Sequence, residues 1–227
     1  MKFSSDNVPV PEPRSGRRAS IDYDSETVRR ILDAAETLFA ENCFAGTRVD
    51  DIAAKAGVNK ATLYYHIGGK EKIYEVVLYR HIKTFADALE KRLEGCDEPV
   101  EGLLEVIRHH AEVSASDDRA ARTVAHELAG GSPRMTPAIV AQYARIYAVT
   151  VHFMASGAAS GRLRTINPAL AHLLLAGPLF VSVINRPLRP MLFDHELLKD
   201  QTKPDLEELT AFLEQVVRDF LALPPKD

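Results

Sequence analysis

The sequence lacks most features of a secreted, metal-binding or membrane protein. Only two of its 227 residues are cysteines, Cys43 and Cys96, which lie far apart and form no CxxC pair. They indicate neither a disulfide framework nor a zinc site, and they fit a reducing compartment. The longest apolar stretch, residues 168–184, is interrupted by His172 and is too short to predict a membrane span.

Catalytic and cofactor motifs are missing as well. No GxGxxG, P-loop or GxSxG motif occurs, and no histidine pair has the spacing of a zincin. The neighbours His109 and His110 would point to different sides of a helix. The sequence therefore predicts no enzyme, no cofactor and no metal site. An enzyme that uses a cavity among the helices is the least supported of three functional classes, after a DNA-binding regulator and a helical binding or scaffold protein.

The amino terminus has no apolar segment of the kind that a secretory signal needs. Residues 1–22 are instead rich in Pro, Ser and Arg, so we expect a disordered tail on a cytoplasmic protein. Arg14, Arg17 and Arg18 could reach a DNA minor groove, but a solvated tail is the favoured interpretation.

The net charge of the whole chain does not indicate a nucleic-acid partner. The chain has 28 basic and 32 acidic residues and a net charge of −4. Residues 42–72, however, contain five Lys or Arg against three Asp or Glu, so this segment is positive. A small local excess on a dimer can still supply contacts to DNA phosphates.

The pattern of residues 47–73 predicts two short helices joined by a tight turn. Gly57 stands where the chain must leave the first helix, and Asn59 can cap the second through its side-chain oxygen. The apolar positions form a small core between the two helices: Ile52, Ala53, Ala56, Val58 and Leu63. This is the pattern of a DNA-binding helix-turn-helix.

The outer face of the second helix carries the proposed chemistry. Once Leu63 turns inward, the residues left on the outside supply hydrogen-bond donors, a methyl group and aromatic rings. They are Lys60, Ala61, Thr62, Tyr64, Tyr65 and His66. Such side chains suit phosphates and base edges, whereas acid-base or covalent catalysis would need paired carboxylates or an activated nucleophile. An ordinary helical hairpin with an aromatic surface is the alternative.

The stretch RRILDAAETLFAENCFAGTRVDDIAAKAGVNKATLYYHIGGKEKIY resembles the amino-terminal domain of the TetR family of bacterial transcriptional regulators, over about residues 25–74. The resemblance implies a three-helix DNA-binding domain and a recognition helix at residues 60–66. It places DNA contacts at Thr47, Arg48, Lys60, Ala61, Thr62, Tyr64, Tyr65, His66 and Lys70. Three positions depart from the usual family residues: Arg48, Ile67 and Gly69.

Apolar periodicity predicts helices along the rest of the chain, and no run of residues alternates as a strand would. Beyond the helix-turn-helix the expected ranges are 25–42, 70–94, 99–114, 117–129, 137–158, 168–185 and 204–222. We expect Ser25 to cap the first of these, and Pro168 and Pro204 to lie in first turns. The fold is therefore all-α with about nine helices, divided into a tail (1–22), a helix-turn-helix domain (23–70) and a ligand-binding and dimerisation domain (71–227).

The last two predicted helices, 168–185 and 204–222, are too apolar for one-sided burial. Pairing with the same helices of a second chain would form a four-helix bundle and a homodimer. A dimer presents two recognition helices, which predicts a palindromic double-stranded DNA operator. The alternative is that these helices close the core of a monomer.

The middle helices contain candidates for binding a small-molecule effector: His110, Arg122, His126, Tyr143 and Tyr147. Arg122 and His126 share one helix face, as do Tyr143 and Tyr147. The TetR resemblance implies an inducer pocket in this domain, mostly apolar with a few polar anchors. The alternative is that the tyrosines are core residues and the histidines lie on the surface.

The preferred function is a ligand-responsive repressor, released from its operator when an inducer shifts helix 70–94. A transcriptional activator and a helical binding or scaffold protein without regulatory DNA binding are the alternatives.

Overall fold

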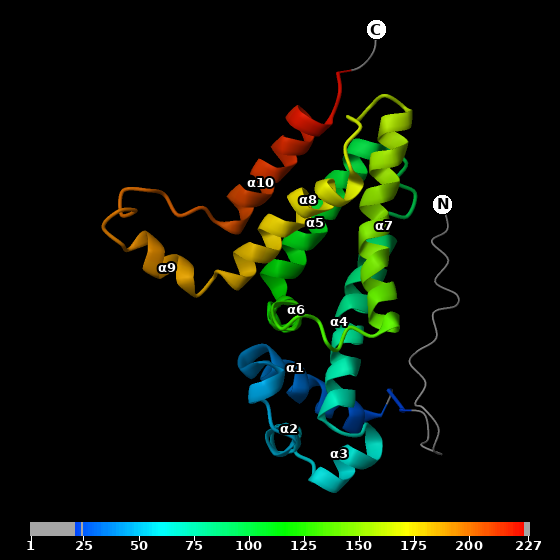
Figure 1. Ribbon diagram of the computed structural model, residues 1–227, viewed down its shortest axis with the longest axis vertical. Coiled ribbons are helices and arrows are strands. Elements are labelled where there is room, and N and C mark those ends of the chain that lie inside the picture. The colour runs from blue at the N-terminus through cyan, green and yellow to red at the C-terminus, as the bar shows by residue number, and fades with distance from the viewer. Residues whose placement is uncertain (1–20, 24, 225–227) are drawn as a thin grey trace. The chain divides into compact units, whose positions relative to one another are not determined.

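The computed structural model describes residues 21–23 and 25–224, and the fold is all-α as predicted (Figure 1). Its helices are α1 (Glu26–Gly46), α2 (Val49–Ala56), α3 (Lys60–His66), α4 (Lys70–Arg92), α5 (Pro99–Ser116), α6 (Arg119–Ala129), α7 (Pro137–Ala159), α8 (Pro168–Ile184), α9 (Leu188–Phe193) and α10 (Leu206–Val216), which continues as the π-helical turn η1 (Val217–Leu221). The β-structure of the described residues is one isolated antiparallel bridge, between Leu163 and Ala222.

Local sequence signals explain several helix starts. Asn167 caps α8 by accepting a hydrogen bond from the Ala169 N–H, and Pro168 occupies the first turn as expected. The prediction for Pro204 was wrong, because Asp205 is the N-cap of α10 and forms a capping box with Glu208. Ser25 also differs from the expectation: it is the N-cap of α1, but its side chain makes no capping bond to the described residues.

Helix α9 was not predicted from the sequence. It lies in the expected break between the last two long helices, and none of its six residues is buried. Figure 1 shows it on an excursion of the chain that leaves from α8 and returns to α10. Short helices with so little buried surface leave no periodic apolar signal, which is why the sequence predicted a loop here.

Helix α1 is interrupted near its carboxyl end. Cys43 has φ 52° and ψ −179°, so regular helical geometry stops after Asn42 and one further turn leads to Gly46. The regular part therefore ends where the sequence predicted. A residue with a side chain and positive φ is uncommon, and it must be held by its surroundings.

The chain forms two compact units. The N-terminal unit comprises the described residues up to Thr84 together with Arg122–Tyr143, and the C-terminal unit comprises Phe85–Ala121 and the described residues from Ala144 onward. Helices α4, α6 and α7 each contribute residues to both units. This division by compactness does not fall at residue 70, so a functional boundary there stays a prediction.

Each unit has its own apolar core. In the N-terminal unit, α1 packs on α2 and α3, and its buried side chains include Ile31, Phe39, Ile52, Leu63 and Tyr74. In the C-terminal unit, α5, α8 and α10 pack together, with buried Leu103, Ile107, Leu175, Leu179 and Leu213. No helix within residues 21–23 and 25–224 is long and apolar enough to cross a membrane.

Two glycines in the C-terminal unit permit close packing. A Cβ on Gly102 in α5 would lie 2.4 Å from atoms of the Phe153 ring, and one on Gly157 would lie 2.4 Å from Leu163 Cδ1. Gly157 therefore lies inside α7, against the side chain of Leu163. Gly161, with φ 69°, does form the turn that follows.

Candidate nucleic-acid interface

The helix-turn-helix has the predicted geometry. Gly57 ends α2 in the left-handed conformation, φ 65°, and its N–H donates to the carbonyls of Ala53 and Ala54. Asn59 Oδ1 accepts hydrogen bonds from the Thr62 N–H at 2.7 Å and from Thr62 Oγ1 at 2.9 Å, so the cap of α3 is confirmed. The predicted core residues Ile52, Ala53, Ala56 and Leu63 are buried, and Val58 is half-buried.

Burial of Leu63 turns the other side chains of α3 outward. Lys60, Ala61, Tyr64 and Tyr65 are exposed, and Thr62 and His66 are half-buried. The Tyr65 side chain is 84% exposed and its ring meets that of His66 edge-on, with centroids 5.2 Å apart. An exposed aromatic cluster beside a lysine is unusual for a solvated surface, and it is available for contacts to DNA.

Lys60 has a partner on α2. Its Nζ lies 2.9 Å from Asp50 Oδ1, and both side chains are more than half exposed. The hydrogen bond to Asp50 raises the pKa of the Lys60 amino group, so Lys60 is charged at neutral pH. An exposed pair of this kind is weak, and the lysine can exchange Asp50 for a DNA phosphate at little cost.

Two of the residues predicted to contact DNA, Thr47 and Lys70, make side-chain hydrogen bonds within the N-terminal unit. Thr47 is 2% exposed, and its Oγ1 donates to the carbonyls of Leu38 at 3.1 Å and Cys43 at 2.8 Å. Lys70 Nζ donates to the carbonyls of Phe44 at 2.9 Å and Thr47 at 3.0 Å. Both side chains hold the turn between α1 and α2, whereas Arg48, next in the chain, is exposed.

The five predicted ligand contacts fall into both compact units. His110 and Tyr147 belong to the C-terminal unit, and Arg122, His126 and Tyr143 belong to the N-terminal unit. Arg122 Nε donates to the Ala40 carbonyl at 3.2 Å, and His126 Nδ1 lies 3.3 Å from the Phe39 carbonyl oxygen. Tyr143 is half-buried on α7.

The C-terminal unit contains a polar and aromatic cluster in which His172 and Thr150 are buried and His110 and Tyr147 are half-buried. The ring of His172 lies 3.8 Å from that of Tyr147 and 6.0 Å from that of His110, and its Nδ1 is 3.0 Å from Thr150 Oγ1. We call these four residues the His172 cluster. The sequence had suggested His110 and Tyr147 as ligand contacts, but its only signal for His172 was a histidine within the apolar stretch 168–184.

Burial controls the charge of this cluster. It lowers the pKa of His172 from 6.5 to about 4 and that of His110 from 6.5 to about 3. His110 Nδ1 lies 2.8 Å from the Val106 carbonyl oxygen, which only accepts, so this nitrogen carries the hydrogen. Both imidazoles are therefore neutral at pH 7 and offer hydrogen bonds without charge.

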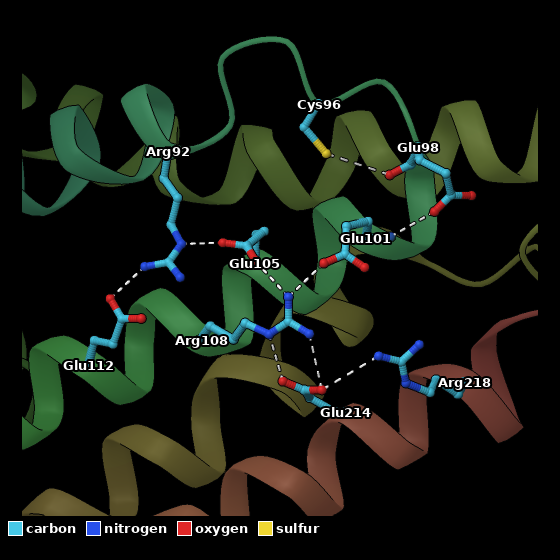
Figure 2. A network of polar contacts seen from close by, with 9 residues as sticks. All are labelled: Arg92, Cys96, Glu98, Glu101, Glu105, Arg108, Glu112, Glu214 and Arg218. Atoms are coloured by element: carbon cyan, nitrogen blue, oxygen red, sulfur yellow. Dashed lines mark hydrogen bonds and ion pairs between the residues drawn. The ribbon is translucent and has the colours of Figure 1, made fainter.

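A network of charged groups joins α4, α5 and α10 in the C-terminal unit (Figure 2). Arg92 pairs with Glu105 and Glu112, and Arg108 pairs with Glu105 and with Glu214, whose Oε1 is 2.8 Å from Arg108 Nε. Burial acts to raise the pKa of Glu105, but hydrogen bonds from Arg92 and Arg108 outweigh it and lower that pKa. The network thus links side chains of these three helices.

Beside this network, α5 and α10 border an open groove of about 500 Å³. Its wall is apolar near Ala111 and Ala211, and Glu112, Glu207 and Glu214 lie along it. The described residues contain no group of three His, Cys, Asp or Glu side chains that could hold a metal ion.

The fold and the recognition surface define a class of regulatory proteins. The family model of bacterial regulatory proteins of the tetR family matches residues 31–77, and that of the YcdC-like protein C-terminal region matches residues 78–176. Together they span more than half of the chain. The protein belongs to the TetR family of transcriptional regulators, as the sequence resemblance had indicated.

Individual relatives agree with this assignment. The HTH-type transcriptional regulator RutR of Escherichia coli strain K12 is 30% identical over 140 residues, which cover 62% of this chain and 66% of RutR. The negative regulator of the biofilm operon icaADBC, IcaR of Staphylococcus epidermidis, is 42% identical over 60 residues, covering 26% of this chain and 32% of IcaR. The chain thus spans less than two thirds of the length of these relatives, which are described as regulators and not as enzymes.

Solved structures share the fold. The TetR family regulator PfmR of Thermus thermophilus has a TM-score of 0.66 at 26% identity, over 83% of this chain and 96% of PfmR. FadR of Bacillus subtilis, solved in complex with stearoyl-CoA, has a TM-score of 0.68 at 22% identity, over 84% of this chain and 97% of FadR. At that identity the second likeness concerns the fold alone.

Proposed function

We propose that the protein is a ligand-responsive transcriptional repressor that binds a palindromic double-stranded DNA operator as a homodimer in the cytoplasm. The observation that carries the proposal is the outer face of α3, where Lys60, Tyr64 and Tyr65 are exposed around a buried Leu63. A helix held in this way by its apolar side is free to enter a major groove with its polar side.

The test is binding to DNA under conditions that suppress unspecific attachment. We expect the purified protein to bind duplex DNA from upstream of its own gene in preference to a scrambled duplex, measured by fluorescence anisotropy at about 0.15 M salt. Two chains per site should be bound. If the protein shows no preference between these two duplexes, and selection from a random duplex pool yields no preferred sequence either, the scaffold alternative replaces the repressor.

Repressor and activator differ in the consequence of binding. Placing the recovered operator upstream of a reporter separates them: a repressor lowers reporter output, and an activator raises it. We favour the repressor because IcaR, which is 42% identical to this chain over 60 residues, is described as a negative regulator.

The dimer would form through α8 and α10. Both helices bury one side in the C-terminal unit and expose apolar side chains on the other, with Leu173 56% exposed and Phe212 64% exposed. Apolar surface of this kind on two neighbouring helices fits a four-helix bundle with a second copy.

Sedimentation velocity tests this interface. Leu173→Glu with Phe212→Glu should shift the protein from dimer to monomer at micromolar concentration, because the two carboxylates would be buried against the partner. Val140→Glu is the matched control, since Val140 is also half exposed but lies on α7. A double variant that remains dimeric would place the interface elsewhere.

For the effector we propose a site at the His172 cluster. His110 and Tyr147, both predicted contacts, meet there with His172 and Thr150. Neutral imidazoles and hydroxyls within an apolar interior would orient an uncharged polar group of a mainly apolar molecule. A coupling of about 1–3 kcal/mol between effector and operator would change DNA affinity from severalfold to a hundredfold.

A further inference from the structure

The interruption of α1 lies next to two carbonyl groups that receive side-chain hydrogen bonds from α6. In a regular helix the carbonyls of Phe39 and Ala40 would accept from the N–H groups of residues 43 and 44. The N–H of residue 44 follows the non-helical φ and ψ of Cys43, whereas the N–H of Cys43 precedes them. Carbonyls beside such an interruption can take side-chain donors from another helix as partners.

Arg122 and His126 supply these partners. Arg122 Nε donates to the Ala40 carbonyl at 3.2 Å, and His126 Nδ1 donates to the Phe39 carbonyl at 3.3 Å. The acceptor is a carbonyl in each case, so the His126 hydrogen must be on Nδ1. The spacing of four residues on α6 matches two consecutive carbonyls of α1, and a basic side chain at a helix carboxyl end is favourable electrostatically.

The turn that follows is anchored from the same side. The Arg134 guanidinium lies 3.5 Å from the centroid of the Phe44 ring, and Arg134 also receives support from Glu127 on α6, whose Oε1 accepts from the Arg134 N–H at 2.6 Å. Phe44 is in the last turn of α1, and Lys70 donates to its carbonyl. Residues 43–47 are thus held by α6 and by the loop after it, and this turn leads directly into α2.

We propose that Arg122 and His126 are positioning residues for DNA binding: they cap α1 from α6, fix the turn 43–47 and thereby set the placement of α2 and α3. In this role they do not contact the effector. The proposal rests on the proposed function for its DNA readout only, because the cap itself can be measured in the protein without DNA.

Hydrogen-deuterium exchange on the full chain tests the cap directly. In Arg122→Ala/His126→Leu, amides of residues 41–48 should exchange about tenfold faster or more, since two carbonyls of α1 lose their side-chain donors and local opening becomes easier. Exchange in α5 and α10 should stay unchanged. Arg119→Ala, which removes the same charge from the start of α6, is the matched control, because Arg119 pairs with Asp117 two residues away.

Conservative variants separate positioning from general folding. Arg122→Lys and His126→Asn keep a donor at each site and should restore slow exchange at residues 41–48. The single variant His126→Leu gives the same test if the double variant does not fold. Unchanged exchange at residues 41–48 in a folded donor-less variant would overturn the proposal.

The DNA readout follows once an operator is known. The donor-less variant should lose about tenfold in affinity for the operator and keep its weak binding to scrambled duplex, because α3 stays exposed but is misplaced. Operator affinity equal to that of the wild type would overturn the positioning role. If the wild type itself shows no preference for any duplex, the proposed function fails while the exchange experiment still decides about the cap.

Discussion

The side-chain amino group of Lys70, at the first residue of α4, lies 3.0 Å from the carbonyl oxygen of Thr47, at the end of α1. The same group reaches the Phe44 carbonyl at 2.9 Å and lies 4.3 Å from the centroid of the Phe44 ring. One lysine therefore joins the start of α4 to the turn before α2. The family resemblance had placed this residue against DNA.

Lys70→Met should lower the free energy of unfolding by about 1–3 kcal/mol, because two carbonyls lose a charged donor. Urea denaturation followed by circular dichroism measures this change. Lys72→Met is the control, since Lys72 pairs only with Glu75 on its own helix among the contacts seen here. Full stability of Lys70→Met together with weaker DNA binding would favour the direct contact predicted from the sequence.

Adjacent residues of α3 should behave in opposite ways. Tyr64→Ala should weaken operator binding by about 1–3 kcal/mol without changing the melting temperature, because Tyr64 is exposed. Leu63→Ala should destabilise the fold by about 2–5 kcal/mol, because Leu63 is fully buried.

Lys60→Ala should also weaken operator binding, and it should reduce the slope of log affinity against log salt by about one. Anisotropy titrations at several salt concentrations give both quantities. Operator affinities of Tyr64→Ala and Lys60→Ala that equal the wild-type value would show that the recognition helix lies elsewhere.

The His172 cluster predicts how stability depends on pH. Its folded-state pKa values, about 4 for His172 and about 3 for His110, lie below the ordinary value of 6.5. The unfolded chain therefore binds more protons below pH 6.5. This stability is fully present above pH 6.5 and falls as the pH drops, by about 1.4 kcal/mol per pH unit for each histidine, until the folded pKa is reached.

Urea denaturation between pH 8 and pH 5 measures this dependence. His172→Asn should reduce the loss of stability between pH 6.5 and pH 5 by up to about 2 kcal/mol. His195→Asn is the control, since His195 is exposed. A pH profile that His172→Asn leaves unchanged would mean that His172 is not buried in the folded protein.

Gly102 should not tolerate a larger residue. The methyl group of Gly102→Ala would lie 2.4 Å from the Phe153 ring, so we expect a loss of about 1–3 kcal/mol. Gly177→Ala is the matched control, because its Cβ would meet no atom within 4 Å and α8 would gain helix propensity. Adding Phe153→Leu to Gly102→Ala should restore part of the stability, whereas equal stability of the two alanine variants would contradict this packing.

The sequence was sufficient for the helices and for the recognition motif. Apolar periodicity predicted every long helix, and Gly57 and Asn59 marked the turn before α3 because each acts on backbone groups a few residues away. Periodicity gave no signal where burial is slight, as in α9, and it did not indicate which polar side chains turn inward, as Thr47 does.

The sequence by itself thus determined that this protein is helical, with Leu63 inside and Tyr64 outside on α3, since such choices depend on spacing within one or two turns. Only the tertiary structure decided which hydrogen-bond partners the buried and half-buried polar side chains have. Arg122 and Ala40 are 82 positions apart, and His172 and Thr150 are 22 apart. Which donor finds which acceptor over such separations depends on how the helices pack, and helical periodicity carries no information about that.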